Sequence, residues 1–117
     1  MATVAKLAKQ AEEEKRQFKQ PLIWIDCEMT GLDLSCNSII EIAVIVTDGA
    51  DLDFRLNGPE IVIHCSDEEL DAMGDWCTRT HRESGLTAKV KASKVTLQEA
   101  ERIILAFLIN EAKLRPG

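Results

Sequence analysis

The sequence has no apolar stretch near the roughly 20 residues that cross a bilayer as a helix, and no C-x-x-C pair. The first absence predicts a protein without a membrane partner, and the second argues against a structural zinc site. There is no internal repeat and no low-complexity segment beyond a charged leader. The four isolated cysteines fit a reducing, intracellular compartment, where a free thiol behaves as a small hydrophobic group.

An excess of basic residues is also missing. The formal net charge is -6, with +2 on residues 1–20 and -8 on residues 21–117. Non-specific affinity for nucleic acid comes mainly from cations that neutralise phosphates, so the acidic part is a poor general nucleic-acid binder. A polyanionic substrate would have to be short and held partly through divalent metal. The alternative is an acidic surface that serves solubility alone.

Residues 1–20 are rich in Ala, Lys and Glu, which predicts a charged leading helix or a disordered leader. The segment lacks the apolar centre of a secretory signal, and the three consecutive acids at positions 12–14 argue against a mitochondrial transit peptide. We expect a cytoplasmic protein, with mitochondrion and nucleus left open. Residues 21–117 are long enough for one domain with one core.

Residues 22–25 are apolar, aromatic and β-branched, and two carboxylates one residue apart follow them. The run predicts a central strand covered on both faces. Because side chains alternate along a strand, Asp26 and Glu28 then lie on one side and can close on one cation. Hard Mg²⁺ or Mn²⁺ prefers such oxygen ligands. The pattern alone is weak, since many surface turns contain it.

Residues 39–47 predict the longest strand, followed by a weak strand at 52–56, a turn at 57–59 and a strand at 61–65. Short connections containing glycine favour an antiparallel meander. Glu41 interrupts the longest strand. It is either a solvated position or a polar group that supports a metal site.

The second half of the sequence is helical in pattern. Ser66 with Glu69, and Thr96 with Glu99, form two capping boxes. Gly85 predicts the end of the first helical region, and the second helix is expected to continue to about residue 114. The first region carries apolar residues at helical spacing, and a basic cluster in a predicted loop follows it: Leu70, Met73, Trp76 and Cys77, then Lys89, Lys91 and Lys94.

Five segments together carry a family resemblance. They read LIWIDCEMTGL at 22–32, IIEIA at 39–43, GPEIVI at 58–63, MGDWCTRTHRESGL at 73–86 and TLQEAE at 96–101. Over about residues 21–115 the chain resembles oligoribonuclease, a branch of the DEDDh 3′→5′ exonucleases. The resemblance implies the ribonuclease-H-like α/β exonuclease fold, truncated here to a three-stranded antiparallel portion plus helices. It also implies that the substrate is short single-stranded RNA, degraded to mononucleotides.

The resemblance assigns roles to individual positions. Asp26 and Glu28 match the first two acids of the DEDD set, which bind two Mg²⁺ or Mn²⁺ ions in the complete enzyme. Leu32 and Trp76 match the pair that sandwiches the 3′-terminal base, while packing in the helix core is the alternative for Trp76. The base pocket is completed by Met29, Thr30 and Gly31.

Three further residues are placed outside the metal and base contacts. His81 is expected to be a pocket or surface residue, and His64 to pack on or near a strand edge. Cys27 is expected to lie on the other strand face, where many relatives have Leu.

The relatives continue with a third acid, a general-base histidine, a fourth acid, groups that bind the 5′ phosphate, and much of a dimer interface. None of these motifs occurs within the 117 residues. We therefore expect a half-complete centre that is inactive alone, and no homodimer of the kind expected for the full-length family. Two alternatives stay open: a non-catalytic truncated chain that binds short RNA or pairs with a full-length subunit, and an incomplete gene model with no function of its own.

Overall fold

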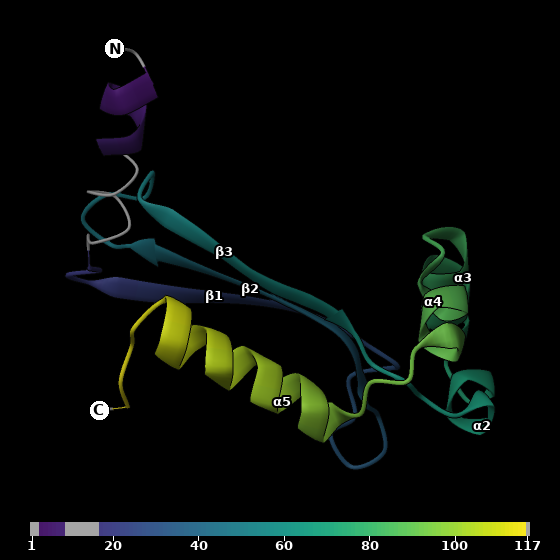
Figure 1. Cartoon of the computed structure of the whole chain (residues 1–117). Helices are drawn as coiled ribbons and strands as arrows, with labels where there is room; N and C mark the ends of the chain where they lie inside the picture. The colour runs from purple at the N-terminus through teal and green to yellow at the C-terminus, as the bar shows by residue number, and fades with distance from the viewer. Residues whose placement is uncertain (1–2, 9–16, 117) are drawn as a thin grey trace.

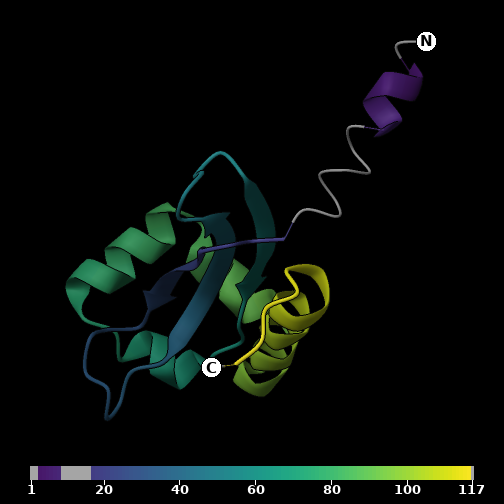
Figure 2. The same ribbon diagram turned by 90° about the vertical axis from the view of Figure 1, so that its left-hand side faces the viewer.

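The computed structural model describes residues 3–8 and 17–116. After a short helix at residues 3–8, three strands are followed by a series of helices, an arrangement that Figure 1 shows from the side and Figure 2 after a quarter turn. The elements after the leader are β1 (Pro21–Met29), β2 (Ile39–Asp48), β3 (Arg55–Val62), α2 (Asp67–Asp71), α3 (Asp75–Glu83), α4 (Leu86–Ala92), α5 (Leu97–Ala106) and the π-helical turn η1 (Phe107–Glu111).

The strands form one antiparallel sheet in the order β1-β2-β3. The α/β class with a three-stranded antiparallel portion is confirmed. The meander is made of other strands than predicted, because β1, β2 and β3 form it and residues 52–56 and 61–65 are not separate strands. β2 is the central strand. Its even-numbered residues Val44 and Val46 are buried in a core cluster with Ile104 and Phe107 of the closing helices. α5 therefore covers one face of the sheet, and it runs beside the strands in Figure 1.

A second core cluster lies where the chain leaves the sheet. Ile40 at the start of β2 is fully buried there with Leu70 of α2 and with Leu86 and Val90 of α4. In Figure 1 the three short helices α2, α3 and α4 stand together beyond one end of the strands. The molecule thus has two apolar clusters, one under α5 and one among these short helices.

The prediction that the first strand is central and covered on both faces is wrong for the described part of the chain. β1 pairs only with β2 and forms an edge of the sheet. Leu22, Ile23, Trp24 and Ile25 are 42% to 57% exposed. The apolar run was correctly assigned to a strand, but its burial depends on what packs against it, which no local pattern specifies.

The predicted turn at 57–59 is also wrong, because β3 runs through it as one strand. The β2–β3 register passes from Ala43 opposite Glu60 to Ile45 opposite Asn57, so Gly58 and Pro59 together oppose Val44. This two-against-one arrangement is a β-bulge. Proline is tolerated at a bulge and on an edge strand, where its missing N–H costs no ladder hydrogen bond. Pairing as a strand ends at Val62 rather than at residue 65.

The helical half is divided more finely than the sequence predicts. The first helical region splits at Gly74, which is the N-cap of α3, and Gly85 follows α3 with φ 85° as the predicted C-terminal glycine. Lys89 and Lys91 lie in α4 rather than in a loop, because Leu86 and Val90 at i, i+4 spacing bury one face of that helix.

In both predicted capping boxes, the N-cap side chain accepts the expected hydrogen bond from the amide three residues later. Ser66 Oγ accepts a hydrogen bond from the Glu69 amide at 3.2 Å, and Thr96 Oγ1 accepts one from the Glu99 amide at 3.1 Å. The α-helical part of the last helix ends at Ala106, and η1 extends the helix to Glu111 instead of to residue 114.

Only part of the leader can be compared with its prediction. Residues 3–8 are helical, and their apolar side chains Val4 and Leu7 are exposed, as expected for a solvated helix. Residues 17 and 18 are not helical, and residues 9–16 lie outside the described residues. Within the described ranges, no helix is both long and apolar enough to cross a membrane.

Gly58 supplies a test of the bulge. A Cβ at this position would lie 2.6 Å from the Val44 carbonyl oxygen and 2.6 Å from Phe107 Cε1. Because the first neighbour is backbone, we expect Gly58→Ala to lower the free energy of unfolding by roughly 1–3 kcal/mol.

Urea denaturation measures this change. The matched control is Gly74→Ala, since nothing lies within 4 Å of a Cβ there. The control should lose only about 0.5 kcal/mol, the cost of alanine at an N-cap. Equal losses in the two variants would contradict the packing explanation.

Candidate functional site

Asp26 and Glu28 lie on the same face of β1, near the end of the strand. Glu28 is directly opposite Glu41 of β2, and Asp26 is opposite Ala43. Directly opposite residues of an antiparallel pair share a sheet face. Since Val44 and Val46 face α5, the two acids lie on the other face. Asp26 is exposed and Glu28 is half-buried.

Glu41 lies on the same face as the two acids and is half-buried, so it is not a simple solvated position; its support of a metal site stays a prediction. Its pKa is raised above the usual value, chiefly by burial and then by the negative charges of Glu60 and Glu28. Asp26 adds to the rise, while Lys89 of α4 opposes it. Three carboxylates on this face therefore act on Glu41, and one of them, Glu60, lies opposite Ala43.

Sequence reasoning missed Glu60. Only the strand register reveals its position. Because β3 is one continuous strand, Glu60 pairs with Ala43 and therefore lies on the face of the acids. Among the described residues, no group of three or more His, Cys, Asp and Glu side chains is arranged to hold a metal ion. In this part of the chain the acids on the face therefore form no closed metal site.

Cys27 lies between the two acids in sequence and on the opposite strand face, as predicted, across from Ile42. Burial raises the pKa of its thiol, and the charges of Asp26 and Glu28 raise it further. A thiol with a raised pKa stays protonated near neutral pH and is a poor nucleophile. This environment favours a packing role for Cys27.

The segment after β1 turns back on itself through Thr30. This residue is buried, its amide donates to the Ser38 carbonyl at 2.9 Å, and its Oγ1 accepts from the Ser38 amide at 2.9 Å. Gly31 sits against the Asn37 side chain, where a Cβ would collide with the amide group. The two contacts fix the start of a loop that leaves Leu32 86% exposed.

Trp76 lies in the first turn of α3 and is 64% exposed. The alternative that this ring fills the core of its helix is therefore wrong; Met73 and Cys77 take part in the core cluster instead. An exposed indole on a short helix has a face available for a ligand. Its packing against a base stays a prediction.

His81 and His64 differ in their surroundings. His81 is only 2% exposed, and its Nε2 lies 2.8 Å from the Met29 carbonyl oxygen, so α3 is joined to the end of β1. A surface role for His81 is excluded by this burial. His64 follows β3, is exposed, and its Nδ1 lies 3.3 Å from the Val90 carbonyl oxygen of α4.

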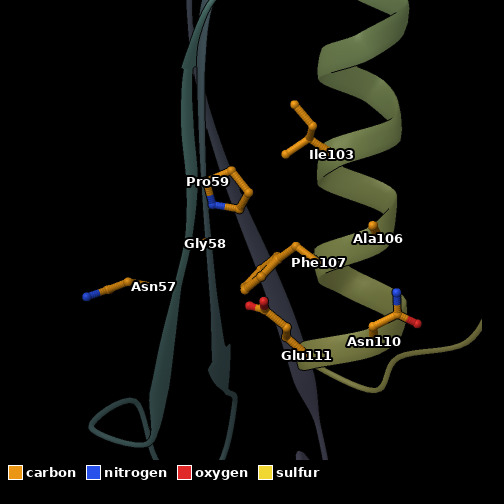
Figure 3. A pocket seen from close by; sticks show the side chains of 8 residues that line it. All are labelled: Asn57, Gly58, Pro59, Ile103, Ala106, Phe107, Asn110 and Glu111. Carbon is orange, nitrogen blue, oxygen red and sulfur yellow. The ribbon is translucent and has the colours of Figure 1, made fainter.

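A separate groove lies between β3 and the closing helices, with a volume of about 340 Å³ (Figure 3). Pro59, Ile103 and Phe107 line it together with the polar ends of Asn110 and Glu111. None of the residues predicted to bind metal or substrate lines this groove, so it is distinct from the acidic face.

Comparison with known proteins identifies the domain. A family model described as "Exonuclease" matches residues 23–112, which include both acids and Trp76. The chain belongs to this exonuclease family. The three-stranded sheet with its helices is consistent with a ribonuclease-H-like exonuclease domain, as the sequence predicts.

Several similar curated proteins carry the name oligoribonuclease. One from Haemophilus influenzae is 56% identical over 90 residues, which are 77% of this chain and 49% of the relative. One from Pseudomonas entomophila is 55% identical over 92 residues, 79% of this chain and 51% of the relative. A protein named "Probable oligoribonuclease" from Dictyostelium discoideum is 51% identical over 87 residues, 74% of this chain and 45% of the relative. The chain thus spans about half the length of these curated relatives. The predicted resemblance to oligoribonuclease is confirmed.

The raised pKa of Glu41 leads to a pH-dependent prediction. A carboxyl with a folded pKa above its usual 4.5 opposes folding when ionised, and the opposition disappears below 4.5, where both states are protonated. We expect Glu41→Gln to raise Tm near pH 7.5 without divalent metal, and the gain to vanish toward about pH 4.

Thermal unfolding at the two pH values measures this gain. The control is Glu101→Gln, which removes an exposed carboxylate from α5. A gain of the same size in the control would attribute the effect to net charge rather than to the acidic face.

Proposed function

We propose that this protein is a 3′→5′ exoribonuclease that degrades very short oligoribonucleotides to mononucleotides. The observation that carries the proposal is the shared placement of Asp26 and Glu28 on the face of the sheet opposite α5. Identity of 51% to 56% with proteins named oligoribonuclease supports it. The acidic body fits a short substrate, because few phosphates have to be neutralised.

We propose that Asp26 and Glu28 hold divalent metal, Mg²⁺ or Mn²⁺, with two ions in the complete enzyme. Their carboxylate oxygens on an accessible face are ligands of the kind these hard cations prefer. When bound, such ions activate a water and stabilise the attacking and leaving oxygens of a phosphodiester. Mutual repulsion among the acids favours a cation at this face, since binding offsets like charges that otherwise oppose one another.

We also propose that Leu32 and Trp76 hold the 3′-terminal base. Both are exposed apolar side chains, and the loop with Leu32 follows directly after the acids. Stacking on an aromatic face tolerates any base, which suits an enzyme that trims RNA without sequence preference. Met29, Thr30 and Gly31 complete the proposed pocket. Four free thiols are compatible with the reducing, intracellular compartment that we propose for the protein.

Residues 1–117 alone should show little or no Mg²⁺-dependent release of mononucleotides from an RNA dinucleotide. Glu41 and Glu60 share the face of Asp26 and Glu28, but among the described residues no three His, Cys, Asp or Glu side chains are arranged to hold a metal ion. Loss of a general base alone commonly lowers a rate by about 10² to 10⁴. Robust turnover that Asp26→Ala abolishes would contradict this expectation, and turnover that survives Asp26→Ala would indicate a contaminating nuclease.

A second candidate function is a non-catalytic chain that binds short RNA or pairs with a full-length subunit. The exposure of Ile23 and Ile25 on edge strand β1 favours it, because an uncovered apolar edge accepts another strand. The two candidates share the base pocket. They differ in whether binding leads to cleavage.

Equilibrium dialysis with a labelled dinucleotide tests the pocket in either case. We expect Trp76→Ala to weaken binding roughly tenfold or more, since stacking contributes about 1–3 kcal/mol per base. Trp24→Phe is the matched control, because Trp24 is also exposed but lies on β1 with its Nε1 donating to Thr47 Oγ1. Equal affinities of wild type and Trp76→Ala would count against a working pocket.

A further inference from the structure

His81 joins the two parts of the molecule that carry the proposed site. Its ring is buried on α3, and Nε2 lies 2.8 Å from the carbonyl oxygen of Met29, the residue after Glu28. A carbonyl oxygen only accepts hydrogen bonds, so Nε2 carries the hydrogen and donates it. The strand register is irregular here, shifting between Glu28 and Met29, and a side chain from a distant helix satisfies the carbonyl.

This hydrogen bond has no substitute among the described residues. Within residues 3–8 and 17–116, no other hydrogen bond links β1 to α3. The core cluster that holds α2, α3 and α4 together contains Ile40 and Val62 from the sheet, but no residue of β1. Within the described residues, this hydrogen bond is therefore the one polar link between β1 and α3.

Residues of the proposed site lie on both sides of the contact. On the strand side, Met29 follows the acids and precedes Leu32 by three positions; on the helix side, Trp76 precedes His81 by five. We propose that His81 is a positioning residue that sets the spacing between the acid-bearing end of β1 and Trp76. The inference rests on the proposed function, since it deepens the role of the same base pocket.

The positioning effect has its physical basis in the free-energy cost of losing the His81 N–H that donates to the Met29 carbonyl. Without it a partly buried carbonyl oxygen has no partner, which favours a displacement of α3 or of the loop toward water. A binding geometry that must bring stacking and metal-binding groups to one nucleotide is sensitive to shifts of about 1 Å. His81 needs no contact with RNA to have this effect.

The test compares His81→Leu with His81→Gln in the full 117-residue chain. Leucine removes the donor, whereas the glutamine amide places an N–H near the position of Nε2. We expect His81→Leu to weaken binding of a labelled RNA dinucleotide about tenfold by dialysis, and His81→Gln to restore binding to within about threefold of wild type. Hydrogen exchange of the amides from Thr30 to Leu32 should accelerate in the leucine variant only.

Ser38→Ala is the matched control, because it removes a different tether of the same loop, the 2.8 Å bond from Ser38 Oγ to Glu69 Oε2 of α2. We expect its affinity to stay within about twofold of wild type, since that bond is exposed. Unchanged binding and exchange in His81→Leu, equal losses in the two His81 variants, or an equal loss in Ser38→Ala would overturn the proposal.

Two measurements keep the inference separate from the proposed function and from folding. If the wild-type chain binds no dinucleotide, the proposed function fails, and the exchange comparison alone decides the role of His81. If His81→Leu does not fold, long-range ¹H–¹⁵N NMR of the wild-type imidazole decides it. A ring with hydrogen on Nε2 supports the contact, and a neutral ring with hydrogen only on Nδ1 overturns it.

Discussion

The alternation of side chains along the central strand β2 is the constraint on which the rest of the structure depends. Val44 and Val46 point to the side that α5 covers, so Glu41 and Ala43 must point to the other side. Pairing with β2 then determines which face each β1 side chain is on, because directly opposite residues share a face. A core built under α5 thereby places Asp26 on the open side. The acids lie on this open side, with Asp26 exposed and Glu28 half-buried, as a consequence of how the apolar face is buried.

Local patterns identified the elements whose signal is contained within a few residues. The β2 strand, the capping boxes at Ser66 and Thr96 and the terminating Gly85 depend on side chains next to their own backbone. The features that the sequence did not reveal depend on distant partners. β1 has the composition of a central strand but is an edge among the described residues, and Gly58 next to Pro59 resembles a turn although β2 holds the pair in a bulge. The candidate site shows the same division. Spacing alone predicted that Asp26 and Glu28 share one strand face, while the placement of Glu60 and the His81 contact needed the tertiary structure.

The electrostatics of the open face connect fold and ligand. Glu41 and Glu28 stand directly opposite each other, an arrangement that costs free energy in an antiparallel pair. Lys89 of α4 relieves part of this repulsion but is a single positive charge. Divalent cations would offset the remainder with oxygen ligands already in place. This repulsion supports the proposal that divalent cations bind at the open face, and it disfavours direct binding of a polyanion there.

The proposed pocket spans two separately packed units, and this division explains why a few polar contacts matter. The acids belong to the sheet, whose core includes Val44 and Val46 under α5, whereas Trp76 belongs to the short helices packed around Leu86 and Val90. Each unit is held together internally by apolar burial, and the hydrophobic effect that drives it is non-directional. Hydrogen bonds are directional and hold a distance within a few tenths of an ångström. The bond between His81 and Met29 thus supplies a positional precision at the boundary that the two cores cannot supply.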